Sequence, residues 1–140
     1  MRLVLDTNVV VAAMRSPSGA SAAILTSARA VQVTLLANVA LALEYDAKCS
    51  LAEHQLAAGL SAGQVSVFID AVIAMLEPVE THYMWRPQLR DPADELVLDA
   101  AVNGQARAIV TFNTRDFGMA PARFGIDLLT PAEAIRRIRT

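Results

Sequence analysis

The sequence predicts an α/β fold, with a parallel or mostly parallel sheet covered by helices on both faces. Three observations predict it. Short apolar segments alternate with helix-like segments along much of the 140-residue chain, an order typical of α/β domains. The chain is 54% hydrophobic and 19% charged, which supports a real core and excludes a disordered protein. The length suits one domain, and because no linker or repeat interrupts it, we expect a single domain over residues 1–140.

The expected strands are short segments, β-branched or leucine-rich, that end at turn or cap residues. Asp6 follows the first strand, Asn38 closely follows the second, and Asn113 follows the fourth. The third, beginning at Glu77, has the weakest strand composition. The expected strands cover residues 2–5, 32–36, 77–81, 107–112 and 126–129.

The expected helices begin and end at residues with capping or breaking chemistry. Pro17 and Gly19 supply the turn between the first two helices. Four later helix starts carry capping signatures, at Asn38, Ser61 with Gln64, Asp91 with Pro92, and Thr130 with Glu133. The expected helices cover residues 9–14, 20–30, 39–51 with a continuation to 60, 61–76, 91–104 and the segment from 130 onward.

The helix expected over residues 61–76 is apolar on more than one face. Its core stripe would consist of Val65, Phe68, Ile69, Val72, Ile73 and Leu76. Val67 and Met75 are apolar off that stripe. A second buried face would serve a homodimer contact or a partner groove, and a helix simply sunk in a small domain is equally consistent.

Charge and residue usage exclude several classes of protein. The net charge of −2 argues against binding nucleic acid by bulk positive charge, although it allows a nuclease whose carboxylates are neutralised by metal. Cys49 is the only cysteine and there are two histidines, which excludes an internal disulfide and a Cys/His zinc cage. Asp6 and Asn8 interrupt the apolar N-terminal stretch, and no apolar run is long enough for a membrane span. We therefore expect a soluble cytoplasmic protein.

Four carboxylates lie at the ends of elements or on a facing helix: Asp6, Glu44, Asp94 and Asp116. Each has a structural alternative, since Asp6 and Asp94 suit helix starts and Asp116 suits a solvated turn. Glu44 lies in an otherwise apolar helix, where a buried carboxylate needs a partner. A cluster of acids without His or Cys selects Mg²⁺ or Mn²⁺, whose usual chemistry is phosphoryl transfer or hydrolysis. The residues thus indicate an acidic, metal-dependent phosphate or phosphodiester site.

Four stretches resemble the motifs of PIN-domain ribonucleases, in the same order and with similar spacing. They are residues 5–9 (Leu-Asp-Thr-Asn-Val), 43–45 (Leu-Glu-Tyr), 90–95 with 98–102, and 109–117. The resemblance covers nearly the whole chain and looks closest to the VapC-like toxins of bacterial toxin–antitoxin pairs. It implies a three-layer α/β/α sandwich, a Mg²⁺- or Mn²⁺-dependent endoribonuclease activity on RNA, and a cognate antitoxin protein as partner.

Carried over residue by residue, the resemblance implies that the catalytic and metal-binding acids are Asp6, Glu44, Asp94 and Asp116. Thr7 and Asn8 would shape the first motif, whereas Thr111 and Asn113 would orient Asp116 or a metal-bound water. The family's fourth motif often has Asp where this chain has Asn113.

Asp94 and Glu95 point about 100° apart on a helix, so only one of them is expected to face the metals. We favour Asp94, with Glu95 and Asp91 as possible substitutes and Asp91 more suited to a helix cap. Arg90 and Arg115 flank the acidic motifs and are candidates for RNA phosphate contacts, or equally for surface ion pairs.

Aromatic side chains and two other protein classes give further interpretations. Tyr83 and Trp85 are candidates for stacking on a base, although packing or surface placement is the commoner role.

A haloacid-dehalogenase-type phosphatase would use Asp6 as nucleophile, but Asn8 replaces its second Asp and Lys48 is the sole lysine. A non-catalytic interaction domain with a degenerate acidic site is the other alternative.

Overall fold

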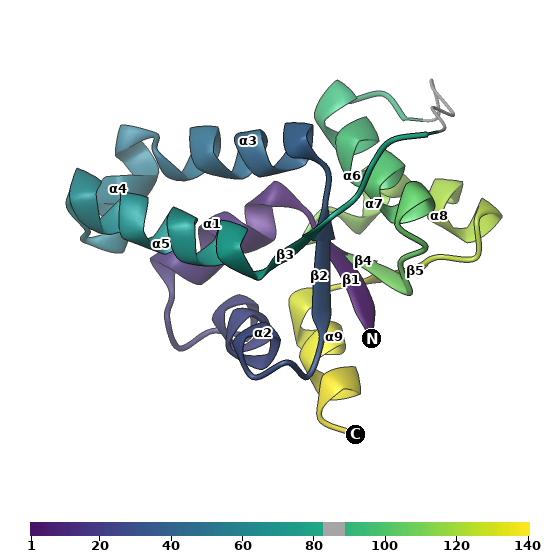
Figure 1. Ribbon diagram of the computed structural model, residues 1–140, viewed down its shortest axis with the longest axis horizontal. Coiled ribbons are helices and arrows are strands. Elements are labelled where there is room, and N and C mark those ends of the chain that lie inside the picture. The colour runs from purple at the N-terminus through teal and green to yellow at the C-terminus, as the bar shows by residue number, and fades with distance from the viewer. Residues whose placement is uncertain (83–88) are drawn as a thin grey trace.

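The computed structural model of the chain describes residues 1–82 and 89–140, and its centre is a five-stranded sheet that is parallel throughout (Figure 1). The strand order is β3-β2-β1-β4-β5, so β1 is the central strand. The strands are β1 (Arg2–Leu5), β2 (Thr34–Ala37), β3 (Leu76–Pro78), β4 (Ala108–Val110) and β5 (Asp127–Leu129). The expected parallel sheet is confirmed.

Helices cover both faces of this sheet. Figure 1 shows α1 to α5 gathered on one side of the strands and α6 to α8 on the other, while α9 lies beside α2. The helices are α1 (Thr7–Arg15), α2 (Ala20–Arg29), α3 (Val39–Cys49), α4 (Ala52–Ala58), α5 (Ala62–Met75), α6 (Pro92–Asn103), α7 (Thr114–Phe117), α8 (Ala120–Arg123) and α9 (Pro131–Ile138). This is the three-layer α/β/α arrangement that the resemblance implies.

The central strand β1 and its neighbour β4 lie in the middle of the core. Leu3, Val4 and Leu5 of β1 are at most 1% exposed, and so are the three residues of β4. Strands covered on both faces read as continuous apolar runs, because neither face meets water. A polar residue that follows such a strand is therefore held in a fixed place at the carboxyl edge of the sheet.

The predicted helix caps are confirmed. The Asn38 side chain accepts from the Leu41 backbone N–H at 2.8 Å, and both predicted capping boxes are formed. Helix α1 begins at Thr7, two residues earlier than expected, because Asp6 caps it. The segment after Asn113 contains α7 and α8, two short helices that the sequence interpretation missed.

Helix α5 ends one residue earlier than expected, because Leu76 already pairs with Leu35 of β2. The weak strand expected at residues 77–81 is therefore Leu76–Pro78. Val65, Ile69 and Val72 form the buried stripe of α5, whereas Ile73 is 42% exposed, so its placement in the stripe was wrong. Val67 is 70% exposed, and the dimer contact expected on that outer face stays a prediction.

Two further sequence expectations concern membranes and the loop after β3. In residues 1–82 and 89–140 no single helix is long and apolar enough to cross a membrane. The pairs α1–α2 and α4–α5 pass such a test of length and composition only together, across bends of 98° and 93°. Tyr83 and Trp85, the stacking candidates, lie outside the described residues.

Candidate active site

Asp6 lies at the carboxyl end of the central strand and is only 7% exposed. Its Oδ1 accepts from the Thr7 backbone N–H at 2.8 Å, which makes it the N-cap of α1. Its Oδ2 accepts from the Thr111 hydroxyl at 2.7 Å. Burial raises the pKa of Asp6, and these two hydrogen bonds oppose the rise. Asp6 therefore serves both as the helix cap and as a residue of the candidate site.

Thr111 follows β4 and is completely buried. The resemblance implied that Thr111 and Asn113 orient Asp116 or a metal-bound water. In the structure the Thr111 hydroxyl instead donates to Asp6, and its oxygen accepts from the Asn113 backbone N–H at 3.0 Å. Neighbouring parallel strands thus bring Thr111 beside Asp6, and a role of Thr111 toward Asp116 or a metal-bound water stays a prediction.

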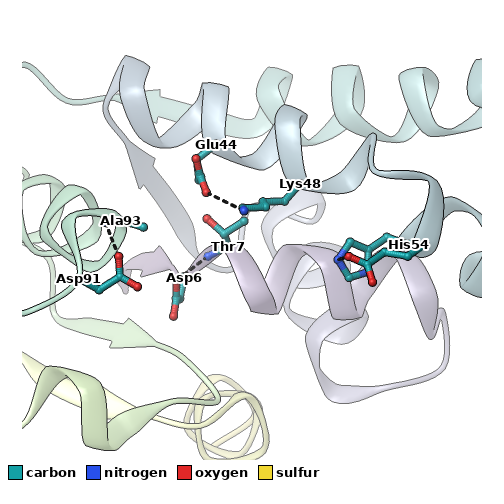
Figure 2. A network of polar contacts seen from close by, with 8 residues as sticks. Asp6, Thr7, Glu44, Lys48, His54, Asp91 and Ala93 are labelled. Atoms are coloured by element: carbon teal, nitrogen blue, oxygen red, sulfur yellow. Dashed lines mark hydrogen bonds and ion pairs between the residues drawn. The ribbon is translucent and has the colours of Figure 1, made fainter.

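The start of α6 carries three neighbouring acids with different contacts. Asp91 is the N-cap, with its carboxylate accepting from the Ala93 N–H at 2.9 Å (Figure 2). Asp94 is 8% exposed, and burial raises its pKa to about 6, with a further contribution from the carboxylates of Asp6 and Asp91. Glu95 Oε1 accepts from the Leu89 N–H at 2.6 Å, which commits that oxygen to the backbone before α6.

Glu44 lies on α3 and faces the end of β1. Its side chain is 25% exposed and its Oε1 lies 3.9 Å from Lys48 Nζ, one turn along the helix (Figure 2). Glu44 is therefore half-buried rather than buried, and Lys48 is a loose partner for it. The next residue, Tyr45, is 1% exposed and its hydroxyl donates to the Leu5 carbonyl, which holds α3 against the strand end beside Asp6.

One cavity of about 730 Å³ brings these residues together. The carboxylates along its wall are Asp6, Glu44, Asp91, Asp94 and Asp116. Thr7, Asn8 and Asn113 also line it. A smaller cavity of about 420 Å³ lies beside it. Asp91, Asp94 and Asp116 line both cavities, and Arg90 and Arg115 line the smaller one. All four expected acids therefore face one cavity at the carboxyl edge of the sheet, where open α/β folds bind ligands.

Comparison with known proteins agrees with this geometry. A sequence model described as PIN domain matches residues 2–115. The chain belongs to the PIN-domain family. Its members are typically nucleases and are generally metal-dependent. No curated protein matches the sequence.

A solved structure shares the fold of this PIN domain. It is the crystal structure of VapBC2 from Rickettsia felis bound to a DNA fragment from their promoter. The match has a TM-score of 0.62 and 16% identity, and it covers 93% of this chain and 98% of that chain. The family resemblance drawn from the four motifs is confirmed, and the haloacid dehalogenase alternative loses its basis.

The cavity of this PIN domain suits a hard divalent cation. Its acidic wall offers oxygen donors, and in the described part of the chain no Lys or Arg forms an ion pair with Asp6, Asp94 or Asp116. Asn8 Oδ1 is buried without a hydrogen-bond partner. Among the described residues no three acidic side chains are close enough to hold one ion between them. Mg²⁺ is commonly held by only one or two carboxylates with waters and substrate phosphates, so this donor set fits it.

The sequence interpretation missed the opposite end of the cavity. Arg15, Lys48 and His54 line it, from α1, α3 and α4. Arg15 is in the last turn of α1, a position where a cation usually serves the helix dipole, so its sequence context did not distinguish it. Tyr45 was also missed as a positioning residue; a tyrosine directly after an acid in an apolar helix was the available signal.

Proposed function

We propose that this PIN domain is a metal-dependent endoribonuclease that hydrolyses RNA phosphodiester bonds and acts as the toxin of a toxin–antitoxin pair. The observation that carries the proposal is the shared cavity wall. Asp6, Glu44, Asp94 and Asp116 come from four separate parts of the chain, yet all of them line it. Asp6, Asp94 and Asp116 have no ion-pair partner among the described residues, and placing such carboxylates together is unfavourable unless a bound metal compensates their repulsion.

In this proposal the four acids bind Mg²⁺ or Mn²⁺, each ion through one or two carboxylates together with waters and substrate phosphate. When bound, the ion supplies an activated water and stabilises charge on the phosphate oxygens. Thr111 and the Thr7 backbone N–H fix both oxygens of Asp6, so that the carboxylate is oriented before metal and substrate arrive. Asp94 must lose its proton to bind a cation, and its raised pKa of about 6 still allows this at neutral pH.

The substrate side of the proposal is supported by groups around the acids. Arg90 and Arg115 line the smaller cavity, where they are candidates for binding phosphates of the same strand. The Phe112 ring is 52% exposed, lines the larger cavity and offers a face on which an unpaired base can stack. These features favour single-stranded RNA over a closed duplex, whose bases are already stacked on one another.

The antitoxin is proposed from the likeness to the VapBC2 complex. The test is co-expression with the product of an adjacent short open reading frame. We expect co-purification and inhibition of RNA cleavage by that product. A neighbouring product that neither binds nor inhibits would contradict the toxin assignment while leaving the nuclease assignment intact.

The nuclease itself is tested by RNA cleavage with Mg²⁺ or Mn²⁺ and with EDTA. Asp6→Asn and Glu44→Gln should each lower the rate by at least about 100-fold, because each removes a charged metal ligand. Asp70→Asn is the matched control, since Asp70 is exposed on α5 and lies outside the cavity. Circular dichroism must show that all variants remain folded.

Cleavage that is insensitive to EDTA, or Asp6 and Glu44 variants as fast as the parent, would show that this metal-site assignment is wrong. Titration calorimetry separates the remaining alternative. A non-catalytic interaction domain would bind neither Mn²⁺ nor Mg²⁺, and both Asp6→Asn and the parent would then give flat titrations.

A further inference from the structure

The larger cavity has opposite charge at its two ends. Figure 2 shows Asp6 and Asp91 toward one end and His54 toward the other, with Lys48 between them. Helix α1 connects the two ends, because Asp6 caps its first turn and Arg15 is its last residue. Nine helical residues span about 13 Å, which separates the Arg15 backbone from Asp6 by that length of helix.

Arg15 is held in this basic end by His54. Its Nη1 lies 3.4 Å from His54 Nδ1. A guanidinium only donates hydrogen bonds, so in this contact His54 Nδ1 is the acceptor. On the other side of the ring, His54 Nε2 lies 3.8 Å from Glu53 Oε1. His54 therefore orients Arg15 without neutralising its charge.

The positive charge of Arg15 is not compensated nearby. Within residues 1–82 and 89–140 it forms no ion pair with a carboxylate, although it is exposed in a cavity whose far wall is acidic. Lys48 has Glu44 as a partner only at 3.9 Å. The basic end thus presents one oriented guanidinium and one loosely paired ammonium toward the same space.

We propose that Arg15, oriented by His54 and assisted by Lys48, binds a backbone phosphate of the RNA strand, a few nucleotides away from the bond that is cleaved. This inference rests on the proposed ribonuclease function and adds a second point of attachment to it. A guanidinium matches the oxygens of a phosphate with two parallel donors. Because the net charge of the protein is −2, attraction of RNA requires such a local cation rather than the overall charge.

Binding is measured in the Asp6→Asn background, where the proposed cleavage is removed, by anisotropy of labelled single-stranded RNA in Mg²⁺ at several salt concentrations. Arg15→Gln should weaken binding about tenfold and reduce the salt slope by about 0.7, the value for one phosphate contact on a single strand. Lys48→Gln should act in the same direction with a smaller effect.

Arg29→Gln is the matched control. Arg29 is an exposed arginine in the last turn of α2, so it has the same charge and the same relation to a helix dipole, but it does not line the cavity. We expect it to change affinity by less than about twofold. His54→Ala tests the positioning role. It should weaken binding less than Arg15→Gln does, and the double variant should bind as Arg15→Gln alone, because one contact cannot be lost twice.

A scan of single methylphosphonate linkages, which remove the charge of one phosphate, locates the contact. We expect one sensitive linkage outside the cleaved bond for the parent and the disappearance of that sensitivity in Arg15→Gln. Equal effects of Arg15→Gln and Arg29→Gln, or a sensitive linkage that persists in Arg15→Gln, would overturn the proposal.

Polyglutamate serves as a probe for an acidic protein segment. If Arg15→Gln weakened binding of polyglutamate but not of RNA, the basic end would belong to a protein partner and the proposal would be wrong. If the parent cleaves RNA and Arg15→Gln matches the Arg29 control, the ribonuclease stands and only this inference fails. If RNA binds through Arg15 but the parent does not cleave it, the phosphate contact stands and the proposed ribonuclease function fails.

Discussion

The Thr111 hydroxyl donates to Asp6 Oδ2 at 2.7 Å, across 105 positions of the sequence. The bond joins the ends of the neighbouring parallel strands β1 and β4. It supplies a donor to a carboxylate oxygen that is almost out of contact with water. The same hydroxyl accepts from the Asn113 N–H, so one buried oxygen joins the first and fourth acidic motifs.

Thr111→Val keeps the shape of the side chain and removes this hydroxyl. We expect a loss of about 1–3 kcal/mol in the free energy of unfolding at pH 7, because a buried carboxylate oxygen and a backbone N–H lose their partners. Urea unfolding measures the change. Thr111→Ser, which keeps the hydroxyl, should be closer to the parent than Thr111→Val; equal stability of Thr111→Val and the parent would show that the bond contributes nothing.

Asp94 makes the metal-free protein sensitive to pH. Well below about pH 4 its carboxyl is protonated in the folded and unfolded states alike. Burial raises its folded pKa to about 6, so the folded state holds the proton more tightly, and stability from this group is lost as the pH rises through about 6. In EDTA at pH 7, Asp94→Asn should therefore be more stable than the parent by about 1–2 kcal/mol.

Urea unfolding of both proteins between pH 4 and 8 checks this expectation, with the exposed Asp70→Asn as control. The two curves should converge toward the acid end. Added Mg²⁺ should reverse the order at pH 7, since it binds the ionised parent better. If the parent were less stable than Asp94→Asn by the same amount at pH 4 as at pH 7, ionisation of Asp94 would not be the cause of the difference.

Asp94 and Glu95 differ in what they face. In the described chain Asp94 lines both cavities, whereas Glu95 lines neither and accepts from the Leu89 N–H. Asp94→Asn should reduce RNA cleavage at least about 100-fold, as expected for a metal ligand. Glu95→Gln keeps an acceptor for Leu89 and should retain cleavage within about tenfold, with its main effect on stability. The reverse order of activities would make Glu95 the ligand.

Gly104 ends α6 where three elements meet. A Cβ there would lie 2.8 Å from the Ala100 carbonyl oxygen and 2.9 Å from Val79 Cγ2. Gly104→Ala should therefore destabilise the protein by about 1–3 kcal/mol in urea unfolding, by overpacking. Gly63→Ala is the contrast, because its nearest neighbour would be 3.9 Å away, and a helical alanine there should stabilise by up to about 1 kcal/mol. Similar effects of the two substitutions would contradict this steric explanation.

Local chemistry explains what could be predicted from the sequence. Caps such as Asn38 and the Ser61–Gln64 box act over three residues, so the sequence states them directly. Strand and helix alternation indicated the α/β class, and four motifs indicated the family and the acids of the candidate site. Boundaries were less accurate, as at Leu76, where pairing with β2 rather than local preference ends α5.

What the tertiary structure decided are contacts between distant residues. Thr111 donates to Asp6 across 105 positions, and Tyr45 donates to Leu5 across 40 positions. Arg15 meets His54 across 39 positions and forms the basic end of the cavity. The sequence by itself determined which side chains can bind a hard cation. Only the packing of α1, α3 and α6 around the central strands decided which of them share a cavity, because hydrogen bonding and burial there depend on neighbours far away in the chain.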